Sequence, residues 1–213
     1  MNRRTLIRVG IINLIVGVLI VSPFLPGPSF LSTPINFISS SIQFLSIPAL
    51  VVSLFGLVGT IMEVKKVSRD KTYKIGARPL LMLTLPIFSF LTVIWLSDFA
   101  RTYSRETAIG RATPLIIAVE KYNRDKGYYP VSLDQLKKES YLKFIPSPWI
   151  MGVAQYQYQP TGDSYRVSFS QNVIMGFNFE IVTYDKNDSH KAEGELETLY
   201  VTNTKHWKYY IYD

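Results

Sequence analysis

Three long apolar segments near the start of the chain limit most strongly what it can fold into. They run over Leu6–Val21, Ile42–Met62 and Pro79–Leu96, and the second carries no charged residue. A helix needs about 20 mostly apolar residues to cross a hydrocarbon core of about 30 Å. The sequence therefore predicts an anchor of three transmembrane helices over residues 1–98, followed by a water-soluble domain over residues 99–213.

Other interpretations of these segments are weighed against that prediction. The first has the basic start and apolar core of a secretory signal peptide, but no small-x-small cleavage pattern follows it. The other two are too long and too free of charge to be expected as helices buried in a soluble core. Helix-breaking residues in these two segments would suit a transporter, but no Asp, Glu, Lys or His lies within the segments. We therefore expect the helix-breaking residues to serve helix packing or to kink the helices. These breakers are Pro48, Gly56, Gly59 and Pro86.

Basic residues beside the apolar segments predict their orientation. Arg3, Arg4 and Arg8 belong to the N-terminus, and residues 63–78 are strongly basic, whereas residues 22–41 carry no charge. Basic segments stay on the cytoplasmic side of a membrane. We therefore expect a multi-pass protein of the cell (inner) membrane with a cytoplasmic N-terminus and an extracytoplasmic C-terminal domain. The apolar loop 22–41 is expected to lie in the membrane interface or between helices.

Charge and cysteine content exclude several function classes. The net charge of +7 lies entirely in the two basic segments, because the chain from Asp98 onward has 14 basic and 14 acidic residues. The domain thus has no positive excess for nucleic acid phosphates. The chain has no cysteine, which excludes disulfides, thiolate metal sites and cysteine nucleophiles.

Residues 98–139 predict helices. Thr113-Pro114 suits an N-cap and first turn, and a helical apolar face follows before Gly127, a natural stop. That face is formed by Leu115, Ile116, Val119 and Tyr122. Residues 96–112 contain no linker-type run, so the third apolar segment and residues 98–126 are expected to form one helical rod, bent if anywhere near Gly110 to Pro114. A capping box at Ser132 opens a short helix to about Glu139.

In the rest of the chain, apolar and polar residues alternate as they do in strands. Strands are expected over residues 154–159, 164–170, 177–184 and 207–212, with a turn at Pro160–Asp163 joining the first two. The predicted domain is therefore α+β, a long helix packed on an antiparallel meander.

The order of motifs resembles the type IV pilin and type II secretion pseudopilin superfamily. Residues 118–130, AVEKYNRDKGYYP, are similar to the end of the long pilin helix, and the SLxxL pattern after it is met by Ser132, Leu133 and Leu136. The motifs that continue the series are Tyr141-Leu142, Ile145-Pro146, Pro148-Trp149 and the Tyr156–Phe169 hairpin. The resemblance covers residues 100–170 well and 171–213 loosely.

This resemblance implies a pilin-like head and not a pilus subunit. Pilins begin with a basic leader, a Gly cleavage site and a single apolar helix with Glu at its fifth position. Met1 to Leu6 lack that Gly and Glu, and the fifth residue beyond Gly76 is Leu81. What carries over is the fold of the head; whether leader processing, a filament or a secretion system is involved stays open.

No residue pattern predicts a catalytic, cofactor or metal site. His190 and His206 have no spacing partner for zinc and are expected at the surface. Tyr184–Ser189 offers closely spaced oxygens for calcium, as in a late loop of some pseudopilins, but lacks the Gly and Glu of a helix-loop-helix site. Whether calcium binds near Asp185 and Asp188 stays open, and a polar turn is the simpler interpretation. We expect no cofactor and no enzyme.

The sequence favours a structural or interaction protein of the bacterial envelope. We expect the bilayer and an envelope protein, or a second copy of the chain, as partners. The alternative is a sensor that binds a glycan or peptide, and a weaker one is a minor transporter subunit. A deep aromatic pocket would favour ligand binding, whereas a flat apolar patch would favour protein contact.

Overall fold

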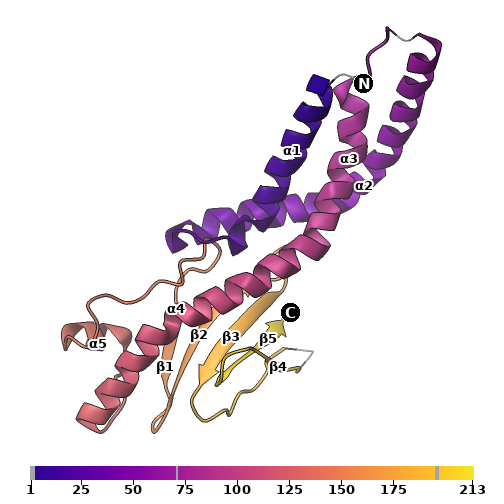
Figure 1. Ribbon diagram of the computed structural model, residues 1–213. Helices are drawn as coiled ribbons and strands as arrows, with labels where there is room; N and C mark the ends of the chain where they lie inside the picture. The colour runs from indigo at the N-terminus through magenta and orange to yellow at the C-terminus, as the bar shows by residue number, and fades with distance from the viewer. Residues whose placement is uncertain (1–2, 71, 195–196) are drawn as a thin grey trace. The chain divides into compact units, whose positions relative to one another are not determined.

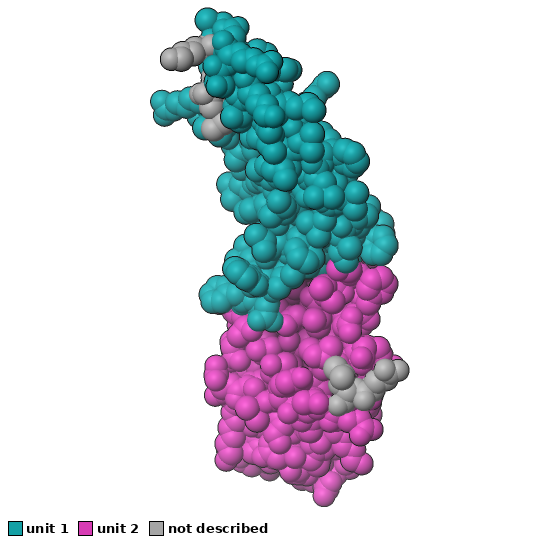
Figure 2. All heavy atoms as spheres, turned by 90° about the vertical axis from the view of Figure 1, so that its right-hand side faces the viewer, with its two compact units in different colours: residues 1–22, 37–99 teal, residues 23–36, 100–213 magenta. Residues whose placement is uncertain are grey.

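The structure, a computed structural model, describes residues 3–70, 72–194 and 197–213. It contains long helices and a five-stranded antiparallel sheet, in two compact units coloured separately in Figure 2. Met1–Ser22 and Phe37–Phe99 form the first unit, and Pro23–Asn36 and Ala100–Asp213 form the second. The division after Phe99 lies next to the predicted boundary at Asp98, but residues 23–36 join the C-terminal unit instead of the anchor.

The first unit is built from apolar helices. These are α1 (Arg3–Val21), most of α2 (Ser32–Arg69) and α3 (Ala77–Leu91). The described chain has three helices long and apolar enough to cross a membrane. α2 begins at Ser32, well before the predicted Ile42, so half of the expected loop 22–41 is helical. Serines and prolines there do not end the helix, because a proline near a helix start costs no hydrogen bond.

The glycines of the first unit allow helices to approach closely. A Cβ at Gly56 would lie 2.3 Å from the Leu83 nitrogen, and one at Gly17 would lie 2.9 Å from the Phe88 ring. Small residues at such crossings let helices pack in lipid, where no hydrophobic effect drives them together. Asn13 is buried and donates to the Val9 carbonyl and to Thr84. Packing, the expected role of the glycines, is what the structure shows for these positions.

Helical structure continues without a break from Ala77 to Lys126. A π-helical turn (Thr92–Leu96) follows α3 and leads into α4 (Ser97–Lys126). The expectation of continuous helix is thus confirmed, but the expected helix start at Thr113-Pro114 is wrong. Pro114 lies inside α4 and costs it one hydrogen bond, the one a residue at that position would donate to the Gly110 carbonyl.

In the second unit, α4 packs on one face of the sheet (Figure 1). Leu115, Val119 and Tyr122 are fully buried, as their helical spacing predicts, while Ile116 is half-buried. Gly127 ends α4 with a φ of +82°, a left-handed conformation that glycine adopts without strain. The short helix α5 (Leu133–Lys138) begins with Ser132 as N-cap, accepting from the Gln135 N–H.

Five antiparallel strands have the spatial order β1-β2-β3-β5-β4. Their bounds are β1 Gln157–Pro160, β2 Tyr165–Asn172, β3 Phe179–Asp185, β4 Tyr200–Val201 and β5 Trp207–Tyr212. The four predicted strands pair in chain order as a meander, with shifted ends. β4 was not predicted; it is only two residues long, and it extends the sheet beyond β5.

The segment Pro23–Asn36, called the strap below, is held by backbone hydrogen bonds to residues 149–152. Gly152 N–H donates to the Pro23 carbonyl at 2.7 Å, Met151 N–H to Leu25 at 3.0 Å, and Gly27 N–H to Trp149 at 3.0 Å. Phe24 of the strap is 1% exposed. The expectation that this loop lies in the interface or between helices is therefore incomplete, because its backbone groups pair with the C-terminal unit.

Candidate functional site

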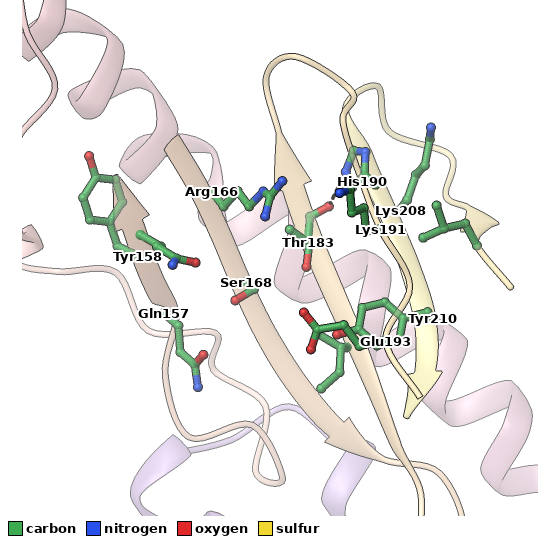
Figure 3. A pocket seen from close by; sticks show the side chains of 13 residues that line it. Gln157, Tyr158, Arg166, Ser168, Thr183, His190, Lys191, Glu193, Lys208 and Tyr210 are labelled. Atoms are coloured by element: carbon green, nitrogen blue, oxygen red, sulfur yellow. Dashed lines mark hydrogen bonds between the residues drawn. The ribbon is translucent and has the colours of Figure 1, made fainter. Parts of the chain in front are cut away.

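A groove of about 490 Å³ lies on the face of the sheet opposite α4 (Figure 3). It is called the sheet groove below. Its lining comes from the open face of the strands and from the segment that follows β3. The lining residues are Gln157, Tyr158, Gln159, Arg166, Ser168, Ile181, Thr183, His190, Lys191, Glu193, Leu199, Lys208 and Tyr210.

Strand alternation makes the floor of the sheet groove polar. In β2, Tyr165, Val167 and Phe169 are buried toward the helix, so the residues between them face the groove. Register pairs then align four polar side chains across the sheet. Gln157 lies opposite Ser168, Ser168 lies opposite Thr183, and Thr183 lies opposite Lys208. Neighbours in such a row lie about 5 Å apart, so an extended ligand would meet an amide, two hydroxyls and an ammonium group in turn.

The charges in the groove are unevenly paired. Arg166 donates to Asp185 at 2.9 Å and to the Ser189 carbonyl at 3.2 Å, so its charge is already compensated. Within the described part of the chain, neither Lys191 nor Lys208 forms an ion pair. Glu193 is the acidic residue of the lining. The groove therefore offers two ammonium groups that have no ion-pair partner among the described residues.

Both histidines are half-buried, not surface residues as expected. The His190 ring lies 3.0 Å from the Thr183 carbonyl through Nε2, and its buried Nδ1 has no hydrogen-bond partner among the described residues. His206 pairs with Asp188 at 2.9 Å. The chain after β3 folds back against the sheet, which sequence spacing does not reveal.

The oxygens considered for calcium are engaged by protein cations and donors. Asp185 accepts from Arg166, from the Asn187 N–H and from Ser189. A calcium ion here would have to displace Arg166. No group of three or more Asp, Glu, His or Cys side chains within residues 3–70, 72–194 and 197–213 is placed to hold a metal ion.

These bonds of Asp185 stabilise the fold, and their contribution can be measured. Burial would raise the pKa of Asp185, but Arg166, the Asn187 N–H and the Ser189 hydroxyl outweigh it and hold this pKa below its usual range. A carboxyl with a lower pKa in the folded chain stabilises the fold above the unfolded pKa of about 3.9, and this stabilisation is lost as pH falls through the folded value. We expect Asp185→Asn to lower the free energy of unfolding by about 1 to 2 kcal/mol at pH 7.

The measurement is urea unfolding of the full chain in detergent at pH 7 and pH 3. The difference between wild type and Asp185→Asn should shrink at pH 3, because the unfolded chain already binds a proton at Asp185 there while the folded chain resists it. Asp163→Asn, at an exposed turn, is the matched control and should change little at either pH. An equal loss at both pH values would contradict the assignment.

A second polar cluster, which sequence analysis missed, is buried between α4 and β3. Glu180 is 0% exposed and accepts from Arg105 at 2.8 Å and from Gln171 at 2.8 Å, while Arg101 lies 3.3 Å away. Burial raises the pKa of Glu180, and the Arg105 charge opposes that shift. Ser104 donates to Gln171 at 2.7 Å. Because Glu180 is fully buried and bonds to residues of both α4 and β2, this cluster joins helix to sheet and is not an open site.

Comparison with known proteins identifies no relative: no protein-family model, no curated protein and no solved structure matches this chain. The site must therefore be interpreted from its own geometry. That geometry is an open polar groove with free ammonium groups, on a unit whose strap follows directly from an apolar helix.

Proposed function

We propose that this is a membrane-anchored, non-enzymatic envelope protein that presents a pilin-like head for contact with another polypeptide. The sheet groove carries the proposal. Its floor is a row of amide and hydroxyl groups that can donate to and accept from a polypeptide backbone, and Lys191 and Lys208 are available for carboxylates on that polypeptide. The long helix on an antiparallel sheet supports the resemblance to pilin heads.

The predicted orientation has support from the strap. The strap connects α1 to α2, and its hydrogen bonds to residues 149–152 support a topology in which the first loop and the C-terminal unit share one side of the membrane. Three crossings would give the first loop and the C-terminus this common side. The basic residues then assign that side as extracytoplasmic. A reporter that is active only outside the cytoplasm should be active when fused after Asp213, and an inactive fusion there with an active one at Lys74 would reverse the orientation.

A polypeptide suits the groove better than a glycan. Sugar rings stack on open aromatic faces, but Tyr210 is only 9% exposed, and Tyr158 is tilted against Tyr165 and donates to the Pro130 carbonyl. The groove is thus neither the deep aromatic pocket nor the flat apolar patch that the two hypotheses envisaged. The second candidate function is a sensor of a small anionic ligand. It is favoured by the two lysines and by the Nδ1 of His190, which has no hydrogen-bond partner among the described residues.

Photo-crosslinking in native membranes tests the proposal. A photoreactive amino acid at Ser168, on the groove floor, should give a discrete polypeptide adduct, whose mass shows whether the partner is another protein or a second copy. Lys208→Glu in the same chain should weaken this adduct several-fold, because it reverses a groove charge. The same amino acid at exposed Asn203, outside the groove, is the control. Equal labelling at both positions would refute a groove partner. The absence of any polypeptide adduct at Ser168, together with binding of a small anion in the groove, would favour the sensor.

A further inference from the structure

The strap, which bonds to one edge of the C-terminal unit, is joined in the chain to an apolar helix. Pro23 lies two residues beyond the end of α1, and two residues of chain reach about 7 Å at most. Its carbonyl accepts from Gly152 N–H at 2.7 Å. At the other end of the strap, the Asn36 side chain, already within α2, donates to the Gly152 carbonyl at 2.8 Å. Residues 149–152 are therefore bonded to a segment that is continuous in the chain with an apolar helix at each of its ends.

Two large aromatic side chains are exposed at this edge. Phe30 of the strap is 81% exposed, and Trp149 is 47% exposed. Neither contributes to the core, although water disfavours both. Trp149 also has a φ of +54°, a left-handed conformation that is costly for a bulky residue and that its hydrogen bonds to Ser147 and Gly27 maintain. The structure thus holds a Trp outward at a position that would suit glycine better.

A cation accompanies the two rings. Arg111 is exposed, donates to the Ser147 carbonyl at 3.1 Å, and has its guanidinium carbon 6.0 Å from the Trp149 ring centre. Ser147 in turn lies 2.9 Å from Ser29, the neighbour of Phe30. These contacts place Phe30, Trp149 and Arg111 on one continuous surface made by the strap, α4 and the loop before Ile150.

We propose that Phe30, Trp149 and Arg111 form a lipid-docking surface that seats the C-terminal unit on the outer headgroup layer of its own bilayer. Trp and Phe rings suit the membrane–water interface, and a guanidinium binds lipid phosphate with two parallel hydrogen bonds. The position of the strap between two apolar helices argues for lipid over a protein partner. The inference rests on the membrane anchor of the proposed function, and it is independent of the sheet groove.

The chain has no cysteine, so single cysteines carrying a spin label report their own depth without background. The full chain in vesicles containing phosphatidylglycerol would be labelled at Phe30→Cys, Trp149→Cys, Leu14→Cys and Val131→Cys. Leu14 lies within α1 and is 64% exposed, and Val131 lies in the loop before α5 and is 74% exposed. Collision with a water-soluble nickel reagent and with oxygen is then measured for each label.

Labels at Phe30 and Trp149 should collide with the nickel reagent several-fold less than the label at Val131, and more than the label at Leu14. Adding Arg111→Gln to the Phe30-labelled chain should raise nickel access, since a phosphate contact is lost. Nickel access at Phe30 equal to that at Val131 would overturn the docking surface. The Phe30 label leaves Trp149 intact, so it decides the matter even if Trp149→Cys does not fold. A Leu14 label open to water would instead overturn the anchor itself.

Discussion

Replacing Val119 by aspartate is expected to remove most of the stability of the C-terminal unit. Val119 is 0% exposed and belongs to the core between α4 and the sheet. A carboxylate there would lie among Leu115, Phe169 and their neighbours with no partner to pair with. Burying an unpaired charge ranks among the most damaging single changes, and we expect a loss of about 4 kcal/mol or more. Natural domains are stable by only about 5–15 kcal/mol, so the unit would be close to unfolding.

Ile117→Asp is the matched control for this change. Ile117 lies two residues away on the same helix but is 61% exposed, so its carboxylate would stay in water. Urea unfolding of the full chain in detergent, followed by near-ultraviolet circular dichroism of the aromatic residues, compares the two variants. Similar losses would show that helix propensity, and not burial, governs this part of α4.

The long helix was predictable because its signal is local. Leu115, Val119 and Tyr122 recur at helical spacing, and this spacing alone identifies the buried face. Pro114 was misleading, since Thr-Pro is a common helix start but is also tolerated within a helix held by packing. Here the apolar face on both sides of Pro114 is buried, with Ala108 and Ala112 before it, and tertiary contacts outweigh the lost hydrogen bond.

The strap and the sheet groove were not predictable because they depend on long-range pairing. Nothing in residues 23–36 indicates that their backbone bonds to residues 149–152, more than a hundred positions later. His190 lies against Thr183 only because the chain folds back after β3. The strand pattern did contain one signal for the buried cluster: Glu180 is in phase with Val182 and Tyr184, which face the core, and an acidic residue in such a position indicates a buried ion pair.

The strap also changes what an isolated C-terminal domain should do. The sequence predicts that residues 99–213 form a water-soluble domain, and that such a domain folds alone stays a prediction. Without Phe24 and the strap backbone, however, Ile150 and Val153, both buried in the full chain, would lose part of their cover. Experiments on this unit are therefore best made on the full chain.

Removal of Glu180 should have the second large effect. Glu180→Ala leaves Arg105, whose side chain is 8% exposed, and Arg101, at 15%, close together with no carboxylate between them. Gln171 also loses one of its two acceptors and keeps the Arg101 carbonyl. Breaking a buried ion pair by deleting one partner costs about 3 to 5 kcal/mol, because the remaining charge stays out of water. The loss should be visible in urea unfolding of the full chain.

A double-mutant cycle separates the ion pair from simple loss of packing. Arg105→Met with Glu180→Leu replaces both charges by apolar groups of similar size, which is often tolerated where either single change is not. We expect the double variant to lose at least about 2 kcal/mol less than the sum of the single variants, because each single change removes the shortest ion pair of the group that stays behind. Arg105 also lies 4.0 Å from the Tyr209 ring centre, so near-ultraviolet circular dichroism reports on the same place.

The pair Lys126–Glu139, at 2.9 Å, is the control, because water reaches both groups and their coupling in the same kind of cycle should be small. Additive losses at Arg105 and Glu180 would show that each side chain acts through its own packing and not through their charge pair.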